Sequence, residues 1–136
     1  MFSHVKANMP HAYFVVIAII ATCVACVAAS GGLFLAKCAL RKRKPPAIVA
    51  WGHPVSGLTA LTVVYVAVTG WQGSADVMLD FGALMLTAAF AGGCLLYALR
   101  ASHLTQPLAI ILIHGGLAIT ACGLLIMGVI SAASTP

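Results

Sequence analysis

The sequence has almost no acidic residues. Only Asp76 and Asp80 are acidic among 136 residues, against seven Lys or Arg. Charged residues make up 7% of the chain, whereas a soluble domain carries about 25%. Hydrophobic residues make up 62%, and a chain this short cannot hide that much apolar surface in one water-soluble core. These proportions exclude a soluble domain, a collagen and a disordered chain, and they indicate an integral membrane protein.

The sequence also lacks the alternation of polar and apolar residues that is typical of β-strands. It has four long apolar runs instead. We expect helices over 11–40, 46–70, 75–99 and 107–131, after a short extramembrane segment 1–10. Each run exceeds the roughly 20 residues needed to cross the hydrocarbon layer of a bilayer. Backbone polar groups must be satisfied internally in lipid, so helices are the simplest solution. The predicted fold is an all-α integral membrane protein, an up-and-down bundle of four transmembrane helices in a single domain.

The first run has an alternative interpretation as a secretory signal peptide. Its segment Ala28-Ala29-Ser30-Gly31 has the small residues of a cleavage site. The apolar part of a signal peptide is about 7–15 residues long, and this run is much longer. We therefore interpret it as the first of the four helices.

The basic residues predict the orientation of the bundle. Six of the seven lie in or next to the loops after the first and third runs, namely Lys37, Arg41, Lys42, Arg43, Lys44 and Arg100. The positive-inside rule places these loops in the cytoplasm and both termini outside, in a bacterial-type inner membrane. Lys6 is the exception. The expected partners of the basic cluster are anionic lipid headgroups of the bilayer rather than nucleic acid.

The second half of the chain repeats the first at an interval of 61 residues. The matches are Ala28 with Ala89, Gly31-Gly32 with Gly92-Gly93, Leu35 with Leu96, Pro46 with Pro107, His53 with His114, and Thr59-Ala60 with Thr120-Ala121. Ala and Leu pairs mean little in this composition, but the Pro, Gly-Gly and His pairs are harder to attribute to chance. The repeat predicts two copies of one helical hairpin, about 11–70 and 75–131, related by an axis along the membrane normal.

The repeat places two histidines at one depth in the membrane. His53 and His114 each lie seven residues after a helix-opening proline, about 10 Å from the cytoplasmic helix ends. Gly32 and Gly93 lie at a similar depth on the first and third helices. Glycines allow close helix packing in membranes. Alternatively, they leave room for a flat ligand between the histidines, and the shared depth favours the ligand.

An ionisable side chain inside a bilayer indicates a functional site. Two imidazoles at one height on diagonal helices can bind one haem iron from opposite faces. Each ligating histidine then needs an acceptor for its other ring nitrogen, most simply a backbone carbonyl or a hydroxyl. The haem carboxylates would face the cytoplasmic side, where Arg100, Lys44 and His103 are available. Thr59 and Thr120 are candidates to line the same site.

In these features the sequence resembles small four-helix membrane b-type cytochromes. The resemblance rests on two segments, His53-Pro54-Val55-Ser56-Gly57-Leu58-Thr59-Ala60 and His114-Gly115-Gly116-Leu117-Ala118-Ile119-Thr120-Ala121. It implies one haem b, because only one pair of histidines is embedded. It also implies an electron carrier rather than an independent enzyme, with no catalytic residues of its own. Its exchange partners would be quinone or other membrane redox subunits of a larger complex.

Two other functions compete with electron transfer. In the first, the histidines serve as polar links between helices in a non-redox structural or assembly subunit. Transport or proton conduction usually needs an intramembrane acid, but Asp76 and Asp80 fall in the first turns of the third helix, where acids suit the helix dipole. Cys23 and Cys26 form a Cys-x-x-Cys pair, which within lipid is typical of small packing residues rather than a metal site.

Overall fold

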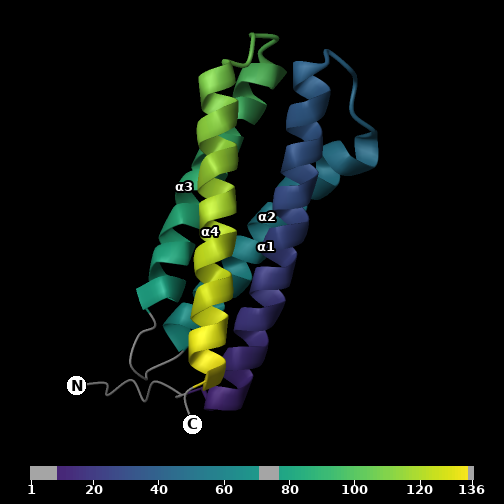
Figure 1. Ribbon diagram of the computed structural model, residues 1–136. Coiled ribbons are helices and arrows are strands. Elements are labelled where there is room, and N and C mark those ends of the chain that lie inside the picture. Colours follow the sequence, from purple (N-terminus) through teal and green to yellow (C-terminus); the bar gives the residue numbers. More distant parts are fainter. Residues whose placement is uncertain (1–8, 71–76, 135–136) are drawn as a thin grey trace, which may run out of the picture.

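The computed structural model describes residues 9–70 and 77–134. Four α-helices make up its regular structure: α1 (His11–Leu40), α2 (Ala47–Gly70), α3 (Val77–Ala101) and α4 (Leu108–Ser134). Successive helices run in opposite directions, so the α1–α2 and α3–α4 loops lie at one end of the bundle (Figure 1). We call this the loop end and the opposite end the core end. All four helices are long and apolar enough to cross a membrane, and the predicted all-helical fold is confirmed.

The helix boundaries at the loop end follow the interval of the repeat. Helices α1 and α3 end at Leu40 and Ala101, and helices α2 and α4 begin at Ala47 and Leu108. Both pairs are 61 residues apart. The sequence prediction ends the third and fourth helices at 99 and 131, slightly before their observed ends. The short segment 71–74 between the second and third predicted helices is expected to form a turn, and it lies outside the described residues.

Both loops begin with the same local turn. Lys42 has a φ of 51° and His103 a φ of 56°, and these residues are again 61 positions apart. In each loop the next residue donates its N–H to the carbonyl five positions earlier, at 2.9 Å. This bond and the left-handed residue before it form the Schellman motif, which satisfies carbonyls that the helix end leaves unpaired. The repeat therefore extends from the helices into the turns that end them.

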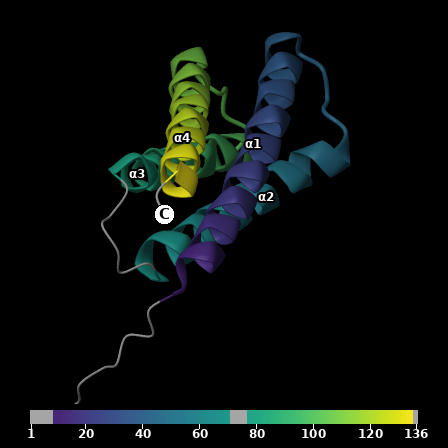
Figure 2. The same ribbon diagram turned by 60° about the horizontal axis from the view of Figure 1, so that its bottom comes forward.

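The bundle is made of two hairpins. Helix α1 packs along α2, and α3 packs along α4; between the hairpins, α1 contacts α4 more extensively than α2 contacts α3. In Figure 2, α1 and α4 are neighbours, whereas α2 and α3 lie on the outer sides. Helices α2 and α4, which carry the two embedded histidines, therefore stand diagonally across the bundle.

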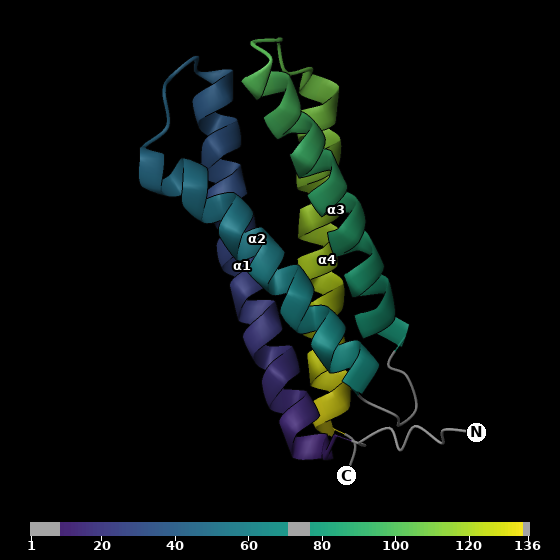
Figure 3. The ribbon, with the colours of Figure 1, turned by 180° about the vertical axis from the view of Figure 1, so that it is seen from behind.

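Only the core end of the bundle is packed. The buried residues are Phe14, Ala18, Ala21, Thr22, Ala25 and Ala28 of α1, Ala60, Val64 and Ala67 of α2, Leu79, Gly82, Ala83, Leu86 and Ala89 of α3, and Ala121, Cys122, Leu125, Gly128 and Ala132 of α4. No residue in 29–59 or 90–120 is buried. The hairpins diverge toward the loop end, and the first turns of α2 swing away from α1 (Figure 3). Pro54 lies inside α2, where proline removes a helix hydrogen bond and promotes a bend.

The packing has the pattern of a membrane protein. Most buried residues are alanines, which let helices approach closely in lipid. Large apolar side chains face outward instead: Leu33 is 68% exposed and Ile48 is 82% exposed. A soluble protein would bury such side chains. The exposed apolar surface is therefore suited to contact with lipid.

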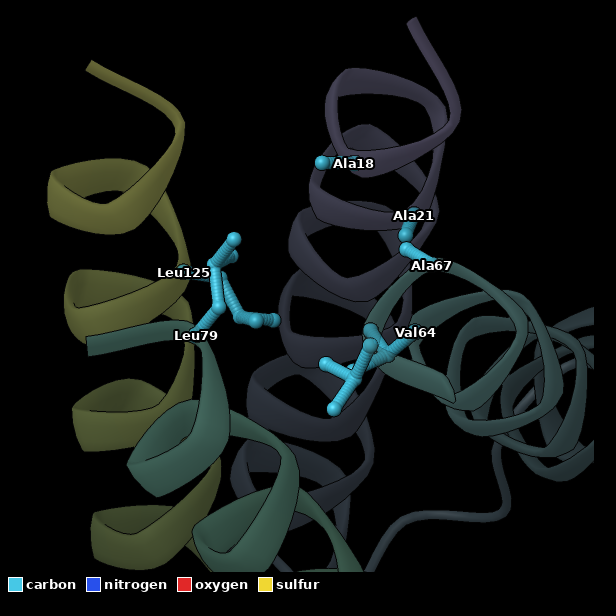
Figure 4. Close-up of a pocket in the computed structure, with 7 residues that line it drawn as sticks. Ala18, Ala21, Val64, Ala67, Leu79 and Leu125 are labelled. Atoms are coloured by element: carbon cyan, nitrogen blue, oxygen red, sulfur yellow. The ribbon is translucent and has the colours of Figure 1, made fainter. Parts of the chain in front are cut away.

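Helices α3 and α4 interlock through glycines at the core end. A Cβ on Gly128 would lie 2.6 Å from the side chain of Leu79, and a Cβ on Gly82 would lie 2.9 Å from that of Leu125. Each glycine thus receives a leucine from the opposite helix. A small apolar pocket lies beside them, lined by Ala18, Ala21, Val64, Ala67, Val68, Leu79 and Leu125. Figure 4 shows both leucines directed toward α1 and α2, so this pocket belongs to the core and not to the histidine site.

Candidate functional site

The site is a pair of histidines contributed by the two hairpins. His53 of α2 and His114 of α4 have ring centroids 5.9 Å apart, and their ring planes are inclined at 83°. The structure therefore brings together the two residues that the sequence selects as ligands. Both rings lie at the boundary between the packed core and the diverging loop end. The last buried residue of α1 is Ala28 and the first buried residue of α2 is Ala60, and these two residues mark the edge of the core.

Each imidazole is held by a carbonyl of the preceding helix. Nδ1 of His53 lies 2.9 Å from the carbonyl oxygen of Ala28, and Nδ1 of His114 lies 2.7 Å from that of Ala89. A carbonyl oxygen can only accept a hydrogen bond, so Nδ1 must carry the proton in both rings. In the neutral imidazole this leaves Nε2 with a free lone pair, which is the form that binds a metal. The structure thus supplies the backbone acceptors that the sequence argument requires.

Gly32 and Gly93 pack against the two imidazole rings. A Cβ on Gly32 would lie 2.9 Å from Cε1 of His53, and a Cβ on Gly93 would lie 3.0 Å from Cε1 of His114. Real Cβ atoms essentially never show the contact expected at position 32, and the one at position 93 is tighter than most. A side chain at either position would require the ring to shift. The sequence suggests that these glycines leave room for a ligand. In the structure the imidazole ring itself occupies that room.

The carbonyl acceptors are the part of the site that sequence reasoning missed. Ala28 and Ala89 are an identical pair in the repeat, but an alanine pair carries little weight in this composition. Their side chains are buried at the edge of the core, and the functional atom is the backbone oxygen. The signal that could have found them is geometric: each lies about one turn before the glycine that faces the ring.

Three other predicted residues lie away from the rings. Thr59 and Thr120 are exposed, and the hydroxyl of Thr59 donates to the carbonyl of Val55 in its own helix. Six residues turn a helix by about 240°, so each threonine points roughly 120° away from the histidine before it. Arg100 is exposed in the last turn of α3, at the loop end. The structure does not bring these residues into contact with the imidazoles, and their roles stay predictions.

The contacts between the hairpins differ on the two sides of the bundle. On the α2–α3 side the rings of Trp51 and Tyr97 have centroids 6.5 Å apart. Nearer the core end, the hydroxyl of Tyr65 lies 3.0 Å from Oγ1 of Thr87. Helices α1 and α4 approach more closely, mainly through small residues of the core. The histidine contacts within each hairpin therefore repeat, whereas these side-chain contacts between α2 and α3 have no described equivalent between α1 and α4.

The ring pair has the dimensions of a two-ligand site. A metal–nitrogen bond is about 2 Å long, so two imidazoles in line on one ion would have ring centroids roughly 6 Å apart. The observed separation is 5.9 Å. No cluster of three or more His, Cys, Asp or Glu able to hold a metal occurs within 9–70 and 77–134. Two protein ligands are the number that haem iron takes when both axial positions are filled by the protein, so the donor set fits haem.

Comparison of the chain with known protein families, curated proteins and solved structures finds no match. The site must therefore be interpreted from its own geometry. That geometry consists of two diagonal helices, two imidazoles with a defined tautomer, and one supporting carbonyl and one glycine for each ring.

Proposed function

We propose that the protein is a membrane electron carrier that holds one haem b between His53 and His114. The bundle would lie in a bacterial-type inner membrane with its basic loops in the cytoplasm, as a subunit of a larger redox complex. The observation that carries the proposal is the ring pair, with centroids 5.9 Å apart and both Nδ1 atoms already bonded to carbonyls. Both Nε2 atoms are thus left for iron.

The chain's own residues have distinct roles in this proposal. The two imidazoles would hold the haem iron through Nε2, and the carbonyls of Ala28 and Ala89 fix their tautomer and ring orientation. Gly32 and Gly93 let the rings lie close against α1 and α3. A haem bound here would supply one-electron transfer at its iron, with a potential set by ligation and burial. Quinone or a neighbouring redox subunit would exchange the electron.

The diverging loop end supports the same proposal. No residue in 29–59 or 90–120 is fully buried, so part of the surface that the two hairpins turn toward each other there is not covered by protein. A macrocycle between the hairpins would cover part of this surface and gain hydrophobic contact. Arg100 and Lys44 lie toward the loop end on exposed positions and are available for the two haem carboxylates.

A structural subunit is the alternative function, and the histidine hydrogen bonds favour it. Side-chain hydrogen bonds between membrane helices contribute about 0.6 kcal/mol each on average. However, each bond joins two helices of the same hairpin, which a short loop already connects. A structural role accounts for the edge-to-face contact of the two rings, but it gives no use to the Nε2 atoms, which haem ligation would employ.

The visible spectrum of the purified full-length protein tests the proposal. We expect a sharp α-band in the reduced-minus-oxidised difference spectrum, together with about one haem per chain. His53→Ala and His114→Ala should each lose the haem while retaining the helix signal in circular dichroism. His11→Ala, at the start of α1 and far from the site, is the matched control and should keep its spectrum. A folded, colourless wild-type protein from cells supplied with haem would contradict the proposal and leave the structural subunit.

A further inference from the structure

The repeat has a consequence for how a macrocycle sits in the site, given the haem binding proposed above. Haem b carries its two vinyl groups at positions that a half-turn about the axis between its two carboxylate side chains exchanges with methyl groups, so its two faces are not equivalent. A half-turn about the axis that relates the hairpins exchanges His53 with His114 and also exchanges the faces of the haem. In a perfectly symmetric site the two orientations would have equal energy and equal populations. Any preference must come from residues that break the repeat.

Close to the imidazoles the repeat is kept. Each ring has an alanine carbonyl as acceptor and a glycine beside Cε1, at nearly equal distances in the two hairpins. These groups contact the rings in the same way on both sides. They therefore give no means of distinguishing the two faces of a bound haem.

One break in the repeat near the site is the aromatic contact between Trp51 and Tyr97. The repeat partner of Trp51 is Leu112, and that of Tyr97 is Ala36. Trp51 precedes His53 by two residues and, with Tyr97, bridges α2 and α3 at a ring separation of 6.5 Å. An alanine and a leucine stand at the equivalent places on α1 and α4. One side of the site is thus bounded by aromatic rings and the other by small aliphatic groups.

We propose that Trp51 and Tyr97 are positioning residues that fix which way round the haem lies. Tyr97 lies four residues after Gly93, on the same face of α3, and Trp51 contacts it from α2. Tyr97 and Trp51 are 58% and 64% exposed, so the pair retains surface for contact with the edge of a macrocycle between α2 and α3. Flat apolar groups gain from stacking or edge contact with aromatic rings. The haem edge between α2 and α3 would therefore contact aromatic rings, whereas the opposite edge, between α1 and α4, would contact aliphatic groups.

Proton NMR of the ferric, haem-loaded full-length protein in detergent measures the two orientations. Each orientation gives its own set of shifted haem methyl resonances. For the wild type we expect one dominant set, at roughly ten to one, which corresponds to about 1.4 kcal/mol. The double variant Trp51→Leu/Tyr97→Ala gives both sides the same residues at these positions and should bring the ratio close to one. Tyr97→Ala alone, expected to lower the ratio several-fold, keeps the test decisive if the double variant releases its haem.

Tyr65→Ile is the matched control. It replaces another aromatic residue of the α2–α3 side by its own repeat partner, Ile126, and removes the contact with Thr87 nearer the core end. The wild-type ratio should persist in this variant. Equal populations in the wild type, or a dominant set that survives loss of both rings, would overturn the inference while leaving haem binding intact. A wild type without haem overturns the proposed function and this inference together.

Discussion

At the scale of single residues, the site depends on the absence of a side chain at Gly32 and Gly93. A methyl group at position 32 would lie 2.9 Å from Cε1 of His53, so the ring must shift or give up its bond to Ala28. Such a bond contributes about 0.5–1.5 kcal/mol. We therefore expect Gly32→Ala to lower haem affinity roughly two- to tenfold. Gly93→Ala should act in the same way on His114. Titration of haem into haem-free protein, followed by absorbance, measures the effect.

Gly123→Ala is the control for this prediction. Gly123 is on α4, nine residues after His114 in sequence, so it faces the opposite side of the helix, and a Cβ there meets nothing within 4 Å. Its haem affinity should match that of the wild type. Equal losses in Gly32→Ala and Gly123→Ala would show that any added methyl group disturbs the helices, and the contact with the imidazole would then have no special role.

Whether a residue of the site could be predicted from the sequence depends on its type. The two histidines and the glycines stand out because His, Pro and Gly-Gly pairs are uncommon in an apolar chain. Ala28 and Ala89 do not stand out, because their contribution is a backbone oxygen that every residue possesses. The contact of Trp51 with Tyr97 could not be predicted either. It depends on how far α2 and α3 stand apart, which sequence periodicity does not encode.

At the scale of elements, packing within the second hairpin depends on the two Gly–Leu contacts. A Cβ on Gly128 would lie 2.6 Å from Leu79 Cγ and 3.0 Å from its backbone nitrogen, and the backbone cannot move aside cheaply. We expect Gly128→Ala to destabilise the bundle by about 1–3 kcal/mol, the usual cost of overpacking. Unfolding in a denaturing detergent, followed by circular dichroism, measures the change.

Gly123→Ala tests the same helix without the contact. A Cβ at this position meets nothing within 4 Å, and alanine is favoured over glycine in a helix by about 1 kcal/mol. Its stability should equal or exceed that of the wild type. A loss in Gly123→Ala comparable to that in Gly128→Ala would attribute the effect to helix flexibility rather than to Leu79.

The elements themselves were the most predictable part of the chain. Four apolar runs bounded by proline, glycine and basic residues give four helices, with errors of a few residues at the ends of the third and fourth. Those errors were avoidable for α3. Applying the 61-residue interval to the end of the first helix at Leu40 gives Ala101, the observed end. The interval fails at the end of α4, because the end of α2 at Gly70 gives Ser131, whereas α4 continues to Ser134.

At the scale of the whole molecule, the bundle is packed at one end and diverges at the other. The buried residues stop at Ala28 and Ala89 and resume at Ala60 and Ala121. Local stability should follow this division, because regions with few buried contacts open at low free-energy cost. A ligand held between the hairpins at the boundary would join the two halves of the loop end. Haem is then expected to act as part of the core.

Removal of haem should therefore lower the stability of the whole bundle. A ligand that binds only the folded state stabilises it by about 2.7 kcal/mol when its free concentration is 100 times the dissociation constant. Cys122 is 9% exposed, so its alkylation, followed by mass spectrometry during heating, reports unfolding. We expect Cys122 to become reactive at a lower temperature in haem-free than in haem-loaded protein. The double variant His53→Ala/His114→Ala should behave like the haem-free protein whether or not haem is added. An unchanged temperature in the wild type would mean that haem, even when present, binds outside the space between the hairpins.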